Sequence, residues 1–287
     1  MKANSPSLTA ELAAMMRAVA HHSKPLRSVI NDPYARLFCG NRTVPALLLH
    51  LLLTRINPDL CRVPLAMVQV GILCALCRHR FMENEVKRLI TEGYDQLVLI
   101  GAGYDTKSLR LKEKRVSVFE LDHPWTQNRK IEIFRRYNLR PDNTVFCNCD
   151  LSRENPGDCL KNNGISGNKQ TILLAEGVFS YFIQERISEI IRNIASITGP
   201  CSMIFDYRHP LTNIQTGAKK WYDNFKRNGE QYRGLLTKVE MDTVLFETGF
   251  ETDRSYDLYN SAKEILPSLK ATSLSNVSEI KIVRKST

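Results

Sequence analysis

The chain has 287 residues and carries 40 lysines and arginines against 30 aspartates and glutamates, a net charge of +10. This length gives one large α/β domain, or a domain with a cap, and the charge suits an acidic partner or a carboxylate substrate. Nucleic acid is not expected as a partner, because the basic residues are dispersed in short pairs typical of a solvated surface. Residues 1–24 contain no apolar stretch of the secretory kind, so we expect a cytoplasmic protein whose eight cysteines are reduced.

The first third of the sequence predicts helices. In Thr9–Ala20, apolar residues recur at the spacing of one helix face. The two most hydrophobic stretches, Pro45–Leu53 and Val63–Cys77, are expected to form cap helices over a ligand cleft, the second being too short to span a bilayer of about 30 Å. We therefore predict that residues 1–92 form a helical cap and residues 93–287 the main domain, the two packed as one compact unit.

The rest of the chain alternates short apolar runs with helical patterns, which is typical of a mostly parallel α/β sheet. Helices are expected at Glu83–Glu92, Gln184–Ile197 and Thr237–Thr248, and Arg78–Arg80 is expected to be the basic end of the apolar helix that precedes the first of them. The expected strands are Leu97–Gly101, Val116–Leu121, Thr144–Cys147, Thr171–Glu176, Cys201–Asp206, Phe250–Asp257 and Ser278–Arg284.

The first strand runs directly into a glycine turn, Gly101-Ala102-Gly103. A strand that turns on two glycines lets a ligand approach the backbone, and the usual ligand of such a turn is a nucleotide. A dinucleotide fingerprint requires a third glycine where this chain has Thr106, and the charge of Asp105 would repel a pyrophosphate. S-adenosylmethionine has no phosphate and carries a sulfonium and an ammonium group against one carboxylate, so an acidic turn suits this ligand better.

Acidic residues stand at the ends of the expected strands. Asp122 follows Gly101 by 21 residues, the offset at which an acid at the end of a second strand binds a ribose diol. Asp150, Glu176 and Asp206 lie at the ends of the next three strands. Because ligands of open parallel sheets bind beyond the carboxyl ends of the strands, we expect acids at these positions to contact a ligand.

Several motifs occur in the order that one known family shows. They are DPYARLF at Asp32–Phe38, Arg78 with Arg80, LIGAGYDT at Leu99–Thr106, FELDHP at Phe119–Pro124, CDL at Cys149–Leu151, AEGVFSY at Ala175–Tyr181 and, more weakly, DLYN at Asp257–Asn260. In this combination the chain resembles the leucine carboxyl methyltransferases, S-adenosylmethionine-dependent O-methyltransferases that act on carboxyl groups. The resemblance implies a class I methyltransferase fold: a Rossmann-like, mostly parallel seven-stranded sheet with helices on both faces and an N-terminal helical cap. Ser152 departs from the family, which often has arginine there.

The resemblance also implies roles for single residues. Arg78 is expected to hold the methionyl carboxylate of the cofactor, with Arg80 as the second choice, because a planar guanidinium matches a carboxylate better than an ammonium does. Glu176 is expected to hold the amino group of the cofactor. The candidates for holding the acceptor are Arg80, Tyr181 and Lys24. The predicted cofactor-binding residues are Arg78, Gly101, Gly103, Asp105, Asp122, Asp150, Leu151 and Glu176, and no metal is expected.

The reaction implied by the resemblance is methyl transfer from S-adenosylmethionine to a carboxylate oxygen. A carboxylate is ionised at neutral pH and needs no general base. We expect the acceptor to be a small lipophilic acid, because the apolar cap stretches offer few hydrogen bonds and the part after Asn260 is short. The alternatives that stay open are a protein C-terminal leucine carboxylate and tRNA, while the intact Gly101, Asp122 and Glu176 argue against a non-catalytic binder.

Overall fold

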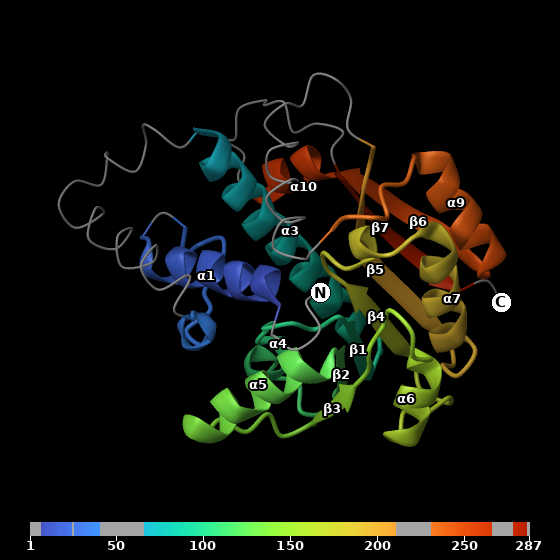
Figure 1. Cartoon of the computed structure of the whole chain (residues 1–287), viewed down its shortest axis with the longest axis horizontal. Coiled ribbons are helices and arrows are strands. Elements are labelled where there is room, and N and C mark those ends of the chain that lie inside the picture. The colour runs from blue at the N-terminus through green and yellow to red at the C-terminus, as the bar shows by residue number, and fades with distance from the viewer. Residues whose placement is uncertain (1–6, 25, 41–65, 211–230, 266–277, 286–287) are drawn as a thin grey trace.

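The computed structural model describes residues 7–24, 26–40, 66–210, 231–265 and 278–285 of the chain (Figure 1). The expected cap helix at Pro45–Leu53 lies outside these residues. Within the described ranges, no helix combines the length and the apolar character that crossing a membrane requires.

The strands form one seven-stranded sheet in the order β3-β2-β1-β4-β5-β7-β6. Strands β1 to β5 run parallel, and β7 lies antiparallel between β5 and β6. The strands are β1 Gln96–Ile100, β2 Ser117–Asp122, β3 Thr144–Asn148, β4 Thr171–Ala175, β5 Cys201–Arg208, β6 Phe250–Asp257 and β7 Ser278–Lys285, so all seven predicted strands are confirmed to within two residues at either end. The chain order reverses between β1 and β4, and ligands of open parallel sheets bind beyond the carboxyl ends of the strands at such a switch point.

Helices cover both faces of the sheet, because the central strands are apolar on both sides. In β1, Val98 and Ile100 pack into a core with α7 and α9, whereas Leu97 and Leu99 pack into a second core with α3. The helical elements are α1 Leu8–His22, η1 Ala35–Phe38, α3 Ala66–Thr91, α4 Lys107–Arg110, α5 Pro124–Arg136, α6 Pro156–Asn162, η3 Phe179–Tyr181, α7 Gln184–Ala195, α9 Lys238–Glu247 and α10 Leu258–Ile265.

Helix α3 is continuous over 26 residues. The sequence predicts two helices here, Val63–Cys77 and Glu83–Glu92, with a helix end at Arg78–Arg80, and this part of the prediction is wrong. Residues 72–91 contain no glycine or proline that would interrupt a helix. The basic side chains do not end the helix either, because Arg78 and His79 meet carboxylates at the ends of neighbouring strands.

Helix α1 begins against the carboxyl ends of the parallel strands. Ala10 lies against the glycine turn after β1. The N–H of Ser7 donates to Oγ1 of Thr126, just after β2, at 3.2 Å, and the hydroxyl of Tyr181, after β4, donates to Oγ1 of Thr9 at 3.0 Å. The start of α1 thus contacts the segments that follow β1, β2 and β4, at the edge of the sheet where the predicted cofactor residues lie.

The DPYARLF segment joins this N-terminal region to the turn after β1. Oδ2 of the buried Asp32 accepts hydrogen bonds from Nε of Arg17 at 3.0 Å and from Oγ1 of Thr106 at 2.7 Å. Its Oδ1 accepts the backbone N–H groups of Tyr34 and Ala35, both at 3.1 Å. One carboxylate therefore fixes α1, the start of η1 and the turn that precedes α4.

Candidate functional site

The glycine turn after β1 has a backbone that favours glycine. Gly101 and Gly103 have positive φ angles of 66° and 49°, which residues with side chains rarely adopt. A Cβ atom on Gly101 would also lie 2.6 Å from Cγ2 of Val178, so the close packing at this point requires glycine. The N–H of Gly103 donates a hydrogen bond to Oδ2 of Asp122, which joins the turn to the end of β2.

Asp122 ends β2 beside this turn, and its carboxyl group is buried. Its Oδ1 accepts a second backbone hydrogen bond, at 2.7 Å, from the N–H of His123. Burial raises the pKa of Asp122 to about 6, although the two backbone donors favour the ionised form. When ionised, this carboxylate only accepts hydrogen bonds, which suits the hydroxyl groups of a ribose.

Asp150 and Leu151 follow β3. Oδ1 of Asp150 accepts hydrogen bonds from the N–H and the hydroxyl of Ser152 at 3.0 and 2.6 Å, and its Oδ2 accepts one from Nε of Arg153 at 2.6 Å. Burial opposes ionisation, but these donors lower the pKa of Asp150. Leu151 packs into the core below. Ser152, where the family often has arginine, therefore serves as a donor that orients Asp150.

Arg78 of α3 faces carboxylates at the ends of β4 and β5. Its Nη1 donates to Oδ2 of Asp206 at 2.9 Å, and its Nη2 lies 3.5 Å from Oε1 of Glu176. The other oxygen of Asp206 accepts the N–H of Gly177 at 2.6 Å. Nε of Arg78 is buried, lies 3.5 Å from Oε1 of Glu176 and has no hydrogen-bond partner within the described part of the chain. The ion pair between Arg78 and Glu176 is thus long, and the buried Nε–H of Arg78 is an unsatisfied donor.

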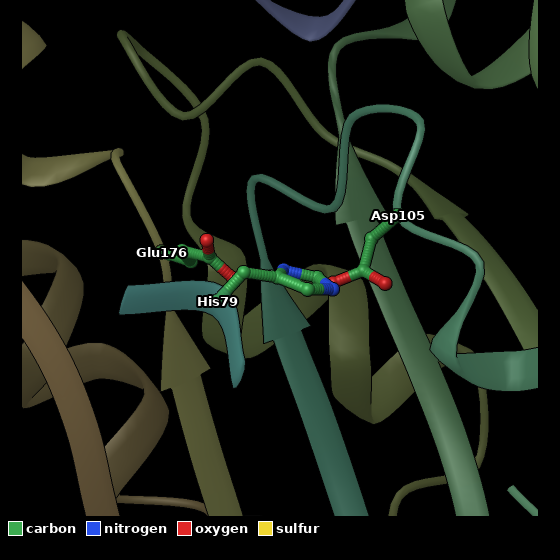
Figure 2. A group of neighbouring side chains, drawn as sticks. All are labelled: His79, Asp105 and Glu176. Atoms are coloured by element: carbon green, nitrogen blue, oxygen red, sulfur yellow. The ribbon is translucent and has the colours of Figure 1, made fainter. Parts of the chain in front are cut away.

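The second oxygen of Glu176 meets two further basic groups. Nδ1 of His79, whose ring lies beside Glu176 in Figure 2, is 2.8 Å from Oε2 of Glu176. Nζ of Lys107 lies 3.4 Å from the same atom. Lys107 also donates to Oδ2 of Asp105 at 2.6 Å. Burial alone would raise the pKa of Glu176, but its three basic neighbours hold that pKa well below its usual range. Glu176 is therefore ionised.

His79, Asp105 and Glu176 offer ligand atoms within 4.8 Å of one another, a spacing that would suit a metal ion. The ammonium group of Lys107 already lies among them, 2.6 Å from Asp105 and 3.4 Å from both His79 and Glu176. A metal ion at the same point would be repelled by this positive charge. We interpret the group as an ion-pair network that orders Glu176.

These residues fit S-adenosylmethionine. The amino-acid end of this molecule carries a carboxylate and an ammonium group on the same carbon atom. Arg78, with its unsatisfied Nε, matches the carboxylate, and the adjacent ionised Glu176 matches the ammonium group. Asp122, at the point where β1 and β2 end, offers an acceptor that would suit the hydroxyl groups of the ribose. These residues therefore suit the amino-acid end and the ribose of the cofactor.

The residues predicted to hold the acceptor lie in different places. Tyr181, in η3 after β4, has its ring 5.2 Å from the ring of Tyr232, beside the strand ends. Arg80 is half-buried, about 200° around α3 from Arg78, and Lys24 is exposed in the turn after α1. The structure brings Tyr181 to the same edge of the sheet as the cofactor residues, and no described contact joins Arg80 or Lys24 to them.

Two members of the network are missed by sequence reasoning, His79 and Lys107. A histidine between two arginines gives no sign of a partner that lies 97 residues further along the chain. The available signal is local: Lys107 stands two residues after Asp105 in a turn, and His79 stands four residues before Glu83 on a helix, both spacings that allow an ion pair.

The sheet order, the glycine turn after β1 and the acids after β2 and β4 define a Rossmann-like class I methyltransferase. The leucine carboxyl methyltransferase family model matches residues 10–195, and the chain belongs to this family. YktD of Bacillus subtilis, a proposed S-adenosyl-L-methionine-dependent methyltransferase, is 28% identical over 182 residues, 61% of this chain and 60% of that protein. Another, from Mycobacterium avium, is 26% identical over 235 residues, 77% of this chain and 74% of that protein.

The crystal structure of a DUF574 family protein from Streptomyces avermitilis has the same fold, with a TM-score of 0.61 and 12% identity over 99% of this chain and 98% of that one. The family, the fold class and the S-adenosylmethionine cofactor that the sequence predicts are thus confirmed. Because the match spans only 60% of the length of YktD, the acceptor and the reaction of the whole protein do not follow from it.

We expect the affinity for the cofactor to fall as the pH drops below about 6. Burial gives Asp122 a pKa of about 6 in the free protein, so the carboxyl takes up a proton in this range and becomes a poorer acceptor for a ribose hydroxyl. If binding requires the ionised form, the dissociation constant of S-adenosylhomocysteine rises by up to about tenfold for each pH unit below that pKa.

Calorimetric titration with S-adenosylhomocysteine between about pH 5 and pH 8 measures this dependence. The Asp122→Asn variant is the control, because its side chain does not titrate: its affinity is expected to be weaker at pH 8 and to change less with pH. A pH dependence equal to that of the wild type would contradict the role given to Asp122.

Proposed function

We propose that this protein transfers the methyl group of S-adenosylmethionine to a carboxylate oxygen of a small lipophilic acid, forming a methyl ester. The observation that carries the proposal concerns three histidines, one on α3 and two in the main domain. His79, His123 and His209 each face a carboxylate of the protein, at 2.8, 3.7 and 3.6 Å. The other ring nitrogen of each also meets a protein group: the guanidinium of Arg110 for His79, the N–H of Trp125 for His123 and the carbonyl oxygen of Leu236 for His209. None of these three therefore has a nitrogen free to act as a general base, and an acceptor that is already ionised needs none.

Cationic and phenolic side chains lie at the ends of β4 and β5, where an acceptor would approach. The guanidinium carbon of Arg208 lies 5.0 Å from the ring centre of Tyr232, which stacks beside Tyr181. The backbone N–H groups of residues 233 and 234 donate to the carbonyl oxygen of Ser180 at 2.9 and 3.1 Å and hold the two tyrosines together. An arginine stacked against an aromatic ring suits an anionic group on an apolar body.

In this proposal the residues bind and orient, and S-adenosylmethionine, when bound, supplies an electrophilic methyl group. Arg78 and Glu176 hold the amino-acid end of the cofactor and Asp122 its ribose. Arg208 and Tyr181 orient the acceptor carboxylate toward the methyl group, and α1, which reaches the same edge of the sheet, keeps water from the reacting groups. No proton has to be removed from the acceptor.

The lipophilic character of the acceptor is inferred from the sequence of the cap. Pro45–Leu53 is rich in leucine and offers no charged side chain, apart from the histidine at position 50, to a polar substrate. An extended peptide needs partners for its backbone N–H and C=O groups, which such a stretch supplies poorly. A protein C-terminal leucine carboxylate and tRNA are the alternatives that the test must separate.

The test is a transfer assay with labelled S-adenosylmethionine against fatty and aromatic acids, peptides ending in leucine, and tRNA. We expect a base-labile methyl ester on one or more of the small acids. If label appears only on the peptide, the proposed carboxyl methylation stands but the proposed small-acid acceptor is wrong. If label appears only on tRNA, both parts of the proposal are wrong. Arg208→Gln is the matched variant: it is expected to raise the KM for the acid about tenfold or more, with unchanged affinity for S-adenosylhomocysteine.

A further inference from the structure

His79 follows Arg78 on α3 and is 3% exposed. Its ring lies between Glu176 and Asp105 (Figure 2). The proposed reaction gives this ring no part as an acid or a base. The ring is nevertheless buried against Glu176, a carboxylate that we expect to bind the cofactor. A positive charge on the ring would offset the negative charge of this carboxylate, so the protonation state of His79 matters for cofactor binding.

The contacts of the two ring nitrogens define that protonation state. Nε2 of His79 lies 3.2 Å from Nη2 of Arg110, and a guanidinium group only donates, so Nε2 accepts. The proton of the neutral ring is then on Nδ1, which lies 2.8 Å from Oε2 of Glu176 and donates to it. The alternative acceptor for a proton on Nε2 is Glu83, at 3.8 Å, which is beyond hydrogen-bond distance.

The charges that surround the ring favour the same neutral form. The other two acids that face His79 already have basic partners: Lys107 bonds to Asp105 at 2.6 Å, and Arg110 bonds to Glu83 at 2.6 Å. Nζ of Lys107 also lies 3.4 Å from Nδ1, so a second positive charge on the ring would be repelled. Burial lowers the pKa of His79; the carboxylate that accepts the Nδ1 proton opposes this effect, and Lys107 reinforces it.

We propose that His79 is a positioning residue that holds Glu176 for the ammonium group of the cofactor. By donating from Nδ1, the neutral ring fixes Oε2 of Glu176 and leaves Oε1 for the cofactor, beside the unsatisfied Nε of Arg78. A neutral donor does this without cancelling the charge of the carboxylate, whereas an imidazolium would form an ion pair and weaken the attraction for an ammonium group. The ligands selected in this way carry an α-amino acid end.

Three substitutions separate the roles of the two ring nitrogens. Asparagine places an amide N–H₂ near the position of Nδ1, glutamine places one near Nε2, and leucine supplies neither. His79→Asn is expected to keep the affinity for S-adenosylhomocysteine to within about threefold. His79→Gln and His79→Leu are expected to lose about tenfold or more, because a hydrogen bond to a charged group is removed.

A second ligand distinguishes this role from a general loss of structure. 5′-Deoxy-5′-methylthioadenosine has the adenine and the ribose of the cofactor but lacks the amino-acid end, so we expect it to bind the wild type and all three variants equally. The proposal is overturned if both ligands weaken in parallel in His79→Leu, or if the asparagine and glutamine variants lose affinity equally. Thermal unfolding of each variant confirms that it is folded.

The protonation state can also be measured directly in the wild type, with His79→Asn used only to assign the signal. Nitrogen NMR of histidine-labelled protein at pH 7 without cofactor is expected to show a neutral ring protonated on Nδ1, and this signal is expected to be missing from His79→Asn. An imidazolium, or a ring protonated on Nε2, would overturn the proposal. Neither the binding nor the NMR measurement uses an acceptor, so both outcomes are independent of whether a carboxylate is methylated.

Discussion

Replacing Glu176 by glutamine is expected to weaken the binding of S-adenosylhomocysteine by about 10- to 100-fold. The amide keeps the shape of the side chain but removes the charge that faces the ammonium group of the cofactor, and a hydrogen bond to a charged group contributes about 1.5–3 kcal/mol. The amide N–H₂ also has to lie against Arg78 or against His79 and Lys107, which are donors. Calorimetric titration measures the affinity directly.

The same substitution is expected to lower the free energy of unfolding at neutral pH. The pKa of Glu176 is lower in the folded protein than its ordinary value of 4.5, so its ionised form stabilises the fold above that pH and ceases to do so as acid protonates it. The difference in the free energy of unfolding between Glu176→Gln and the wild type is therefore largest at neutral pH, and it becomes smaller below about pH 4.5. Urea unfolding at several pH values measures it.

Glu85→Gln is the matched control. Glu85 is another acid of α3 with two basic partners, Arg88 at 2.9 Å and Arg254 at 2.6 Å, and it lies away from the carboxyl ends of the strands. Its replacement is expected to lower the stability while leaving the affinity for S-adenosylhomocysteine unchanged. A similar loss of affinity in both variants would contradict the role given to Glu176.

The strands and the acids at their ends can be predicted from the sequence for a simple physical reason. The central strands are buried on both faces, so each is a short continuous apolar run, as in Leu97–Ile100. A charged residue that ends such a run lies at the edge of the sheet, where a ligand can reach it. Asp122 and Glu176 are placed by this rule without knowledge of any partner.

The partners of those acids cannot be read from the sequence. Arg78 precedes Glu176 by 98 residues and Asp206 by 128, and only the packing of α3 on the sheet brings them together. Helical periodicity separates Arg78 from Arg80 by about 200°, but it does not say which of them faces the strand ends. The predicted break in α3 fails for the same reason, because three basic residues in an apolar helix indicate a helix end until their carboxylate partners are known.

A buried ion pair beneath β2 is equally hidden in the sequence. Nζ of Lys130 on α5 lies 2.5 Å from Oε2 of Glu120, and both side chains are completely buried. In the sequence Glu120 reads as one more acid near a strand end, and Lys130 reads as part of a basic helix surface. Their pairing results from α5 packing against β2, which depends on the tertiary structure.

Replacing Lys130 by methionine is expected to destabilise the fold by about 3–5 kcal/mol, the cost of leaving one member of a buried ion pair without its partner. Burial already raises the pKa of Glu120 against the opposing effect of Lys130, and the loss of Lys130 raises it further. The folded variant then binds a proton more readily than the unfolded chain, so its stability relative to the wild type is expected to recover as the pH is lowered from about 7.

The double variant Glu120→Gln/Lys130→Met separates charge from packing, and urea unfolding of the four proteins forms a double-mutant cycle. Methionine occupies a volume close to that of the lysine stem, so removing both charges is expected to restore most of the stability that Lys130→Met loses. Oε1 of Glu120 has no hydrogen-bond partner among the described residues, so replacing the carboxylate by an amide removes no hydrogen bond at this atom. Equal instability of the single and the double variant would mean that the pair acts through packing rather than through the charge of Glu120.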